Sequence, residues 1–219
     1  FVGSATGSGD AYLAGGVLTS TVTIPSLTSG CILVKVGVNY ANTGGVASGL
    51  DVTGVTFNAV AMTLQKEQGA TSEAAPYNRC EIYSLVSPPG AGTYLVVVTY
   101  NLSTQSTGTE ESIIQTEWWQ GVHQTTPSSG SAGAQGTGNI SYAITSATGQ
   151  IVTDSVSKRT NNSVISAGAG QTLTYQKQVS TGGGAIRAFG GYEAGAASVT
   201  TSYTSDNEYA AAAISLQAP

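Results

Sequence analysis

Residues 80–100 read CEIYSLVSPPGAGTYLVVVTY, and this stretch decides the fold class. Two runs typical of strands flank a Pro88-Pro89-Gly90 turn, which predicts a β-hairpin. The second arm is apolar on both faces, one formed by Tyr94, Val96, Val98 and Tyr100 and the other by Leu95 and Val97. A strand with one solvated face should alternate apolar and polar residues, so this arm predicts cover on both sides. The second cover would be a loop, a glycan or another chain.

The rest of the chain repeats this pattern of strands and turns. Residues 32–40 alternate cleanly and predict a central strand. Residues 55–57 and 60–64 flank Asn58, a residue type that tolerates left-handed backbone, which predicts a tight hairpin. Weaker runs follow at 140–144, 151–156, 172–179, 186–192, 199–203 and 209–216. The four alanines of the last run are interpreted as part of a closing strand rather than as a helical turn.

These runs predict an all-β fold, an antiparallel two-sheet β-sandwich with jelly-roll-like connections. A β-sandwich of 219 residues is routinely one domain, so we predict a single domain over residues 1–219. Residues 128–138, rich in Gly, Ser and Ala, are interpreted as a surface loop.

The composition limits the classes of function. Only 9% of residues are charged, against roughly 25% in an ordinary soluble domain. The 7 basic residues are spread along the chain, which argues against nucleic acid or an anionic membrane as a partner. No run approaches the ~18 apolar residues of a membrane span, so membrane insertion is not expected. The sequence begins at Phe1 without Met, as a secreted protein with its leader removed or a trimmed chain would.

Two cysteines, Cys31 and Cys80, each open a predicted strand. In an exported protein one disulfide between them is the expected arrangement, and two buried free thiols are the alternative. With the single histidine, His123, they offer too few ligands for a metal site, and no cofactor is expected.

Three stretches resemble, in this order, a β-sandwich module of exported bacterial proteins and viral structural proteins: GVTFNAVAMTLQK at 54–66, residues 80–100, and WWQGVHQTTP at 118–127. A narrower similarity is to jelly-roll subunits of extracellular fibrils and of pili other than type IV. In such assemblies a terminal strand of one subunit often completes a sheet of the next. The resemblance implies a homopolymeric structural protein at the cell surface or outside the cell.

Residues 1–16, FVGSATGSGDAYLAGG, are the candidate donated strand, with Phe1, Val2 and Leu13 as the side chains that would fill a neighbour's pockets. The alternative is that they form the first strand of their own chain. Trp118 and Trp119 are further assembly candidates, because neighbouring residues of a strand face opposite ways and at most one is exposed. One Trp in the core and one at an interface is the alternative. An exposed Trp would also suit a carbohydrate-binding module.

Asn101, Asn139 and Asn161 each begin an Asn-x-Ser glycosylation acceptor sequence. A serine hydrolase is not expected, because no Gly-x-Ser-x-Gly motif is present and His123 fits a turn before Pro127. Neither calcium ligands nor a pair of glycosidase carboxylates can be specified from the acidic residues. Lys35 raises the idea of a Lys–Asn isopeptide cross-link, but a surface lysine is the preferred interpretation.

The sequence thus predicts a glycosylated, non-enzymatic subunit of an extracellular filament or surface assembly, which polymerises through strand faces or edges. A carbohydrate-binding module and a viral fibre or decoration protein are the alternatives.

Overall fold

The computed structural model describes residues 3–9, 16–39, 51–69, 78–101, 111–159, 165–181 and 184–219, with only the backbone described at 3–9, 180–181 and 184–185. Every paired strand in this part of the chain is antiparallel to its neighbour, and no helix occurs in it. The predicted all-β antiparallel class is therefore confirmed.

The strands form four sheets, which we name A to D. Sheet A has the order β1 (Gly3–Gly9), β9 (Glu111–Trp119), β3 (Cys31–Asn39), β7 (Asn78–Val86) and β6 (Thr63–Gly69). Sheet B has the order β2 (Val17–Ile24), β8 (Gly92–Asn101), β4 (Asp51–Phe57) and β5 (Val60–Ala61). Sheet C has the order β10 (Ser128–Thr137), β16 (Glu208–Leu216), β12 (Ile151–Arg159), β14 (Gly184–Ala194) and β13 (Thr172–Thr181). Sheet D pairs β11 (Ile140–Thr145) with β15 (Ser198–Tyr203).

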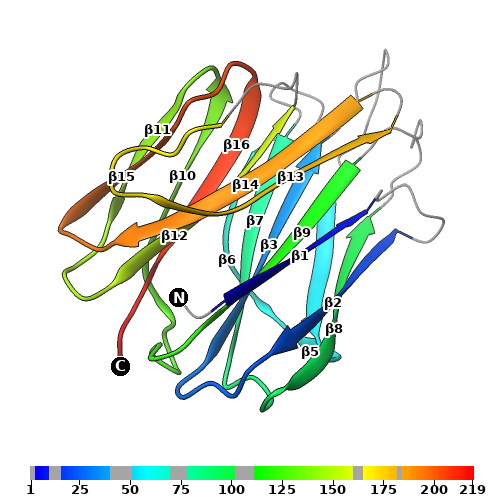
Figure 1. The fold of residues 1–219 in the computed structure, drawn as a ribbon, viewed down its shortest axis with the longest axis vertical. Coiled ribbons are helices and arrows are strands. Elements are labelled where there is room, and N and C mark those ends of the chain that lie inside the picture. The colour runs from blue at the N-terminus through cyan, green and yellow to red at the C-terminus, as the bar shows by residue number, and fades with distance from the viewer. Residues whose placement is uncertain are drawn as a thin grey trace.

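The four sheets stack face to face in the order B, A, C, D, as Figure 1 shows from right to left. One apolar core lies between sheets A and B, a second between A and C, and two smaller clusters between C and D. Because sheets A and C are covered on both faces, all nine residues of β3 are buried and so are residues 152–158 of β12. This explains why β3 carries hydrophobic or small side chains at nearly every position.

The two halves of the chain share one strand order. Sheet A, built by β1 to β9, reads β1-β9-β3-β7-β6, and sheet C, built by β10 to β16, reads β10-β16-β12-β14-β13. The corresponding pairs are therefore β1 with β10, β3 with β12, β6 with β13, β7 with β14 and β9 with β16. Strands β2 and β8 of sheet B correspond likewise to β11 and β15 of sheet D, whereas β4 and β5 have no counterpart among the described strands.

The contact between the halves follows the same correspondence. Strand β3 packs on its equivalent β12, β7 packs on β16 as β14 packs on β9, and β6 packs on β10 as β13 packs on β1. These reciprocal contacts are those of a two-fold dimer interface, formed here within one chain. Small residues let the sheets approach: a Cβ at Gly37 would lie 3.1 Å from the Cβ of Ala188 and 3.3 Å from that of Ser157.

Several predicted elements are confirmed. Strand β3 is the middle strand of sheet A, and the four alanines lie in β16. The hairpin at Asn58 joins β4 to β5, with φ of 50° at Asn58 and 62° at Ala59. Positive φ at both turn residues gives the turn that matches the right-handed twist of a two-residue hairpin. In the first half, β1 to β4 alternate between sheets A and B, whereas β4 and β5 lie together in sheet B and β6 and β7 lie together in sheet A. The jelly-roll-like connections stay a prediction.

Two predictions about elements are wrong. The two arms of residues 80–100 do not pair, because β7 lies in sheet A and β8 in sheet B, so the Pro88-Pro89-Gly90 turn crosses between sheets. Residues 128–138 are not a surface loop, since β10 pairs with β16 along its whole length. Small residues suit this strand because its neighbours come close: a Cβ at Gly133 would lie 2.8 Å from the carbonyl oxygen of Ala211.

Candidate functional site

The first described segment is an edge strand of sheet A. Strand β1 pairs with β9 in unbroken register, from Gly3 opposite Trp118 to Gly9 opposite Ser112. In this structure the segment thus serves as a strand of its own chain, which was one of the two alternatives for residues 1–16. Phe1, Val2 and Leu13 lie outside the described residues.

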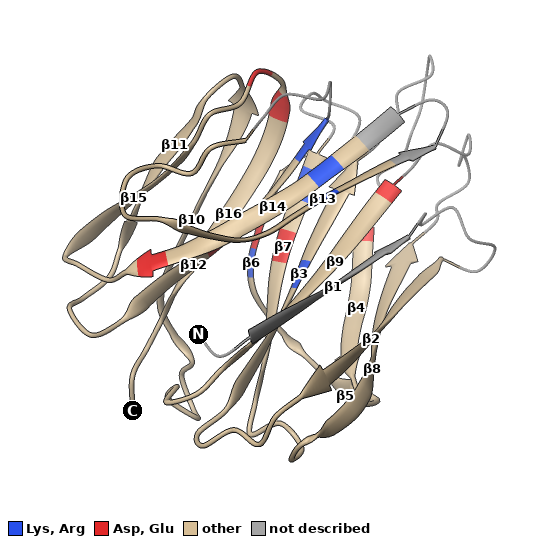
Figure 2. Cartoon of the chain, in the orientation of Figure 1, with Lys and Arg blue, Asp and Glu red and all other residues tan. Residues whose placement is uncertain are grey.

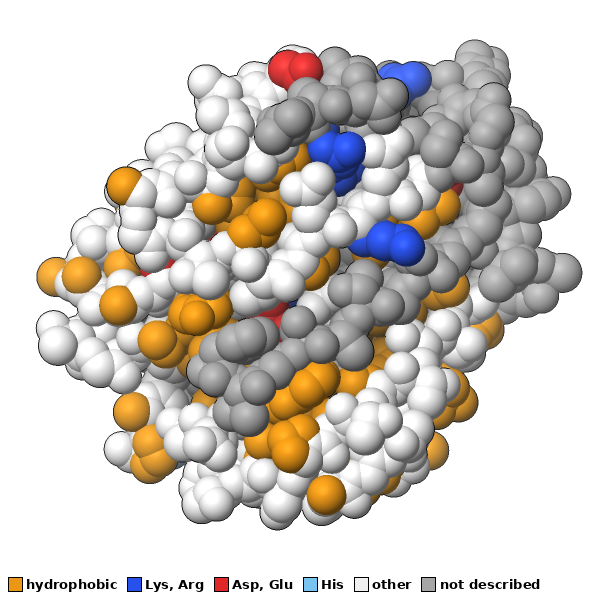
Figure 3. All heavy atoms as spheres, in the orientation of Figure 1, with side chains coloured by type: hydrophobic (Ala, Val, Ile, Leu, Met, Phe, Trp, Pro, Cys, Tyr) orange, Lys and Arg blue, Asp and Glu red, His pale blue; other side chains and the backbone are white. Residues whose placement is uncertain are grey.

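The outward surface of sheet B carries no charged side chain along β2, β8 and β5, which are uncoloured in Figure 2. Paired residues of neighbouring strands share a face. This surface, the sheet B outer face, consists of Thr19, Thr21, Thr23, Thr93, Leu95, Val97, Thr99, Thr56 and Ala61. Leu95 is 47% exposed, so no described residue supplies the second cover that residues 80–100 predict. Charged side chains are also sparse on the face drawn in Figure 3.

The tryptophans lie on opposite faces of β9, as predicted. Trp119 is buried between sheets A and C, where its ring meets Tyr192 edge-on at 5.7 Å between centroids. Trp118 is half-buried against the core between sheets A and B. Because Trp119 is 2% exposed, it cannot form the surface of a sugar-stacking platform.

The predicted disulfide between Cys31 and Cys80 is wrong. Both cysteines are buried and neither forms a disulfide, and they lie toward opposite ends of the ladder between β3 and β7. Cys31 pairs with Val86 whereas Cys80 pairs with Gly37, six positions along β3, which separates the two cysteines by roughly 20 Å. Burial raises the pKa of each thiol to about 12, so both side chains behave as small apolar residues.

Lys35 is completely buried, so its interpretation as a surface lysine is wrong. Its Nζ lies 2.7 Å from Oε1 of Glu117, and both side chains are 0% exposed. The ammonium also donates to the Thr153 hydroxyl at 2.8 Å. Hydroxyl and indole donors surround the carboxylate, with Thr174 at 2.9 Å, Thr153 at 3.1 Å and Trp119 Nε1 at 3.2 Å. Strands β3, β9, β12 and β13 all contribute, so this network ties sheet A to sheet C.

A second buried acid, Asp154, points to the other side of sheet C. Its carboxylate accepts hydrogen bonds from the Tyr203 hydroxyl at 2.6 Å, from Gln171 Nε2 at 3.1 Å and from the Gly191 amide at 3.1 Å. Burial raises the pKa of Asp154 to about 6, and the hydrogen bonds and Lys35 only partly offset this effect. The side chain of Asp154 thus holds β15 and residue 171 against β12.

An arginine with three carboxylates lies at one end of sheet A. Arg79 bonds Asp51 at 2.8 Å, Glu67 at 2.9 Å and the buried Glu81, which also accepts the Tyr83 hydroxyl. Burial raises the pKa of Glu81. Within the described part of the chain, no group of His, Cys, Asp and Glu side chains is arranged to hold a metal ion.

His123 has a turn-forming role, as predicted. Its Nδ1 accepts the backbone amide of Thr126 at 3.1 Å and lies 3.1 Å from the hydroxyl of the same residue. Of the glycosylation candidates, Asn101 and Asn139 are exposed at strand ends, and Asn161 lies outside the described residues.

The sequence could not indicate the buried ion pair, because Lys35 alternates with apolar neighbours as a surface lysine on a half-buried strand would. The signal that could have been used is Glu117, an acidic residue among apolar ones two residues before Trp119. In the residues that the structure describes, no helix is long and apolar enough to cross a membrane. No family model, curated protein or solved structure matches this chain.

Proposed function

We propose that this protein is a structural, non-enzymatic subunit of an extracellular filament or similar surface assembly, in which copies join by strand addition. The observation that carries the proposal is the pairing of β1 with β9. The sequence of β1 is GSATGSG, composed only of glycine, serine, alanine and threonine. Such a strand offers little apolar side-chain surface, so its attachment depends mainly on the backbone ladder.

The backbone hydrogen bonds of such a ladder are the same whether the strand comes from the same chain or from a second copy. If β1 of one subunit leaves, the edge of β9 keeps unpaired N–H and C=O groups that need a partner. Strand β1 of a second copy presents the same groups and the same register. When each subunit passes its strand to the next, the contact is heterologous and does not close, which gives a filament rather than a dimer.

The sheet B outer face supports the same proposal. An uncharged array of threonine with Leu95 and Val97 causes no charge repulsion when copies approach each other. Threonine and valine also have stiff side chains, so packing them costs little conformational entropy. We propose that this face makes the weaker, lateral contacts of the assembly. Glycans on Asn101 and Asn139 would remain at the surface of the assembly.

The test is deletion of residues 1–9, with negative-stain electron microscopy and light scattering of the intact and shortened proteins. We expect the intact chain to polymerise, the shortened chain to stay monomeric, and an added peptide of residues 1–9 to bind the shortened chain. A peptide with Ala5→Pro and Thr6→Pro should fail to bind, because one of two successive N–H groups of an edge strand points at its partner and proline has no N–H at either position. The matched control, Ala5→Ser with Thr6→Ser, should bind. Filaments from the shortened chain would disprove strand addition, and an intact chain that is monomeric under all conditions would disprove the proposed function.

A further inference from the structure

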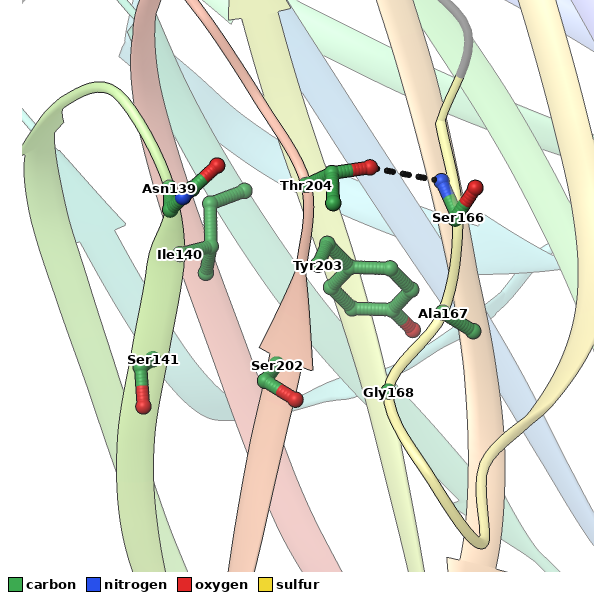
Figure 4. Close-up of a pocket in the computed structure, with 9 residues that line it drawn as sticks. All are labelled: Asn139, Ile140, Ser141, Ser166, Ala167, Gly168, Ser202, Tyr203 and Thr204. Atoms are coloured by element: carbon green, nitrogen blue, oxygen red, sulfur yellow. Dashed lines mark hydrogen bonds between the residues drawn. The ribbon is translucent and has the colours of Figure 1, made fainter.

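Sheet D contains a hollow of about 300 Å³ at one end, shown in Figure 4. Three short segments form it: residues 139–141 at the start of β11, residues 202–204 at the end of β15, and residues 166–168 beside β15. Its position is that of β4 in the first half, since β4 flanks β8 and β15 is the counterpart of β8. Among the described residues of the second half, the bridge between Ala167 and Tyr203 occupies this place. We call this cavity the β11–β15 hollow.

The floor of the hollow is apolar and firmly held. Ile140 and Tyr203 are paired across the two strands and are 1% and 3% exposed. The Tyr203 ring packs edge-on against Phe189 at 5.0 Å, and its hydroxyl is bound by Asp154. The third segment is fixed by the Ser166 amide, which donates to the Thr204 hydroxyl at 3.0 Å (dashed in Figure 4), and by the Gly168 amide on the Ser202 carbonyl at 2.8 Å. The floor is therefore preformed.

The rim carries hydrogen-bonding groups with spare capacity. Among the described residues, no protein group bonds the hydroxyls of Ser141, Ser166 or Ser202. Asn139 uses its Oδ1 to accept the Ser205 amide at 3.1 Å, which leaves its Nδ2 amide for a ligand. Gly168 lets this segment lie close against β15, because a Cβ there would lie 2.0 Å from the Ser202 hydroxyl.

No charged side chain lines the hollow, so neither anions nor cations find a counter-charge in it. Serine hydroxyls donate and accept, as sugar hydroxyls do, and an apolar floor suits the C–H face of a sugar ring. The volume lies at the lower limit of small-molecule sites, which fits a single ring. We propose that the β11–β15 hollow binds one ring of a neutral saccharide.

The saccharide has two sources. It is either a free or partner-borne sugar, or the first ring of a glycan on Asn139, whose acceptor sequence includes Ser141 of the same rim. In the second case Asn139 Nδ2 is the attachment atom of the glycan, and in both cases the serine hydroxyls and the apolar floor contact the ring. The sugar-binding proposal does not depend on the filament proposal. A monomer that binds sugar would support sugar binding, and a filament that does not bind sugar would refute sugar binding while leaving the filament proposal intact.

The first arm of the test uses the unglycosylated chain and two-dimensional NMR titration with glucose, galactose, mannose and N-acetylglucosamine. At least one sugar should give saturable, millimolar shifts at 139–141, 166–168 and 202–204, whereas sorbitol and sulfate should not. Ser141→Ala with Ser202→Ala should weaken binding at least ten-fold. The matched control, Thr19→Ala with Thr21→Ala on sheet B, should leave it unchanged. Melting curves of each variant check that the fold is retained.

The second arm uses the protein from its native source. Peptide mass spectrometry should find a glycan on Asn139 if the sugar is the protein's own, and enzymatic removal of that glycan should speed amide hydrogen exchange at residues 202–204. Binding in the first arm with an unmodified Asn139 assigns the hollow to an external sugar. Absence of saturable binding together with an unmodified Asn139, or equal shifts with sorbitol, overturns the proposal.

Discussion

The substitution Lys35→Met tests the network between sheets A and C. Methionine keeps an unbranched apolar chain of similar length but removes the ammonium, so Glu117 keeps its hydroxyl and indole donors and loses its counter-charge. Both side chains are 0% exposed and the two charged atoms are 2.7 Å apart. Breaking a buried pair by removing one partner costs about 3–5 kcal/mol, because an uncompensated charge is left in the interior.

The free energy of unfolding should therefore fall by about 3–5 kcal/mol in urea titrations at pH 7. For a chain of this size, 1 kcal/mol corresponds to roughly 2–4 °C, so the melting temperature should fall by about 6–20 °C. The matched control is Lys177→Met, an exposed lysine of β13, which should change stability by less than about 0.5 kcal/mol.

A double-mutant cycle separates the pair from other effects of the substitution. Glu117→Gln should cost a similar amount, and the double variant should be more stable than the sum of the two losses predicts, by about 1–3 kcal/mol. If Lys35→Met cost no more than Lys177→Met, or if the two losses simply added, the ion pair would not be a buried unit and the reasoning would be refuted.

Three further predictions concern pH, backbone and thiols. The pKa of Asp154 is raised from 3.8 to about 6, so the folded state binds this proton more tightly than the unfolded state. The stabilising contribution of the protonated Asp154 is therefore complete below pH 4 and is lost as pH rises through 6. The free energy of unfolding, measured by urea titration, should fall by about 2–3 kcal/mol over this range. In the Asp154→Asn variant this pH dependence should be absent. Gly69→Ala should cost more than about 3 kcal/mol by the same assay, because φ is +123° and a Cβ would lie 2.2 Å from the Asn78 carbonyl oxygen, whereas Gly54→Ala, with open space, should be nearly neutral. Cys31 and Cys80 should react with a thiol reagent only after denaturation, and a melting temperature that fell on addition of reductant would contradict the two free thiols.

The sequence predicted strands better than it predicted their partners. The alternation in β3 and the turn at Asn58 are local properties, and both are confirmed. The pairing of β7 with β8 was wrong because a proline-rich turn suits a hairpin and a crossing between sheets equally well, and alternation gives a strand's faces without naming its neighbour. Cys31 and Cys80 each open a predicted strand, but their distance depends on register, which no local signal supplies.

The remaining failures share one cause, the second covered face of sheets A and C. Strand β3 carries Lys35, Gly37 and Asn39 on one side, as a half-solvated strand would, so Lys35 looked solvated although sheet C covers that side. Strand β10 has one β-branched residue, Thr137, and has glycine at 130 and 133, where neighbouring backbone leaves no room for a Cβ, so the usual composition of a strand was missing. The hollow in sheet D could not be foreseen, since the three segments that line it are brought together only by the fold.

The duplicated strand order has a consequence for synthesis on the ribosome. Strands β1 to β9 emerge first and can complete sheets A and B before β10 exists, as N-terminal units generally do. During that interval the face of sheet A that later meets sheet C is open to water, and Lys35 and Glu117 lie on it. The charged pair Lys35–Glu117 keeps this exposed face of sheet A hydrated. Packing of this face against the same face of a second nascent chain is then unfavourable, because both charges would lose their water. We therefore expect a chain with Lys35→Met and Glu117→Leu to reach the same fold but with a lower soluble yield, measured against the wild-type chain in cell-free translation.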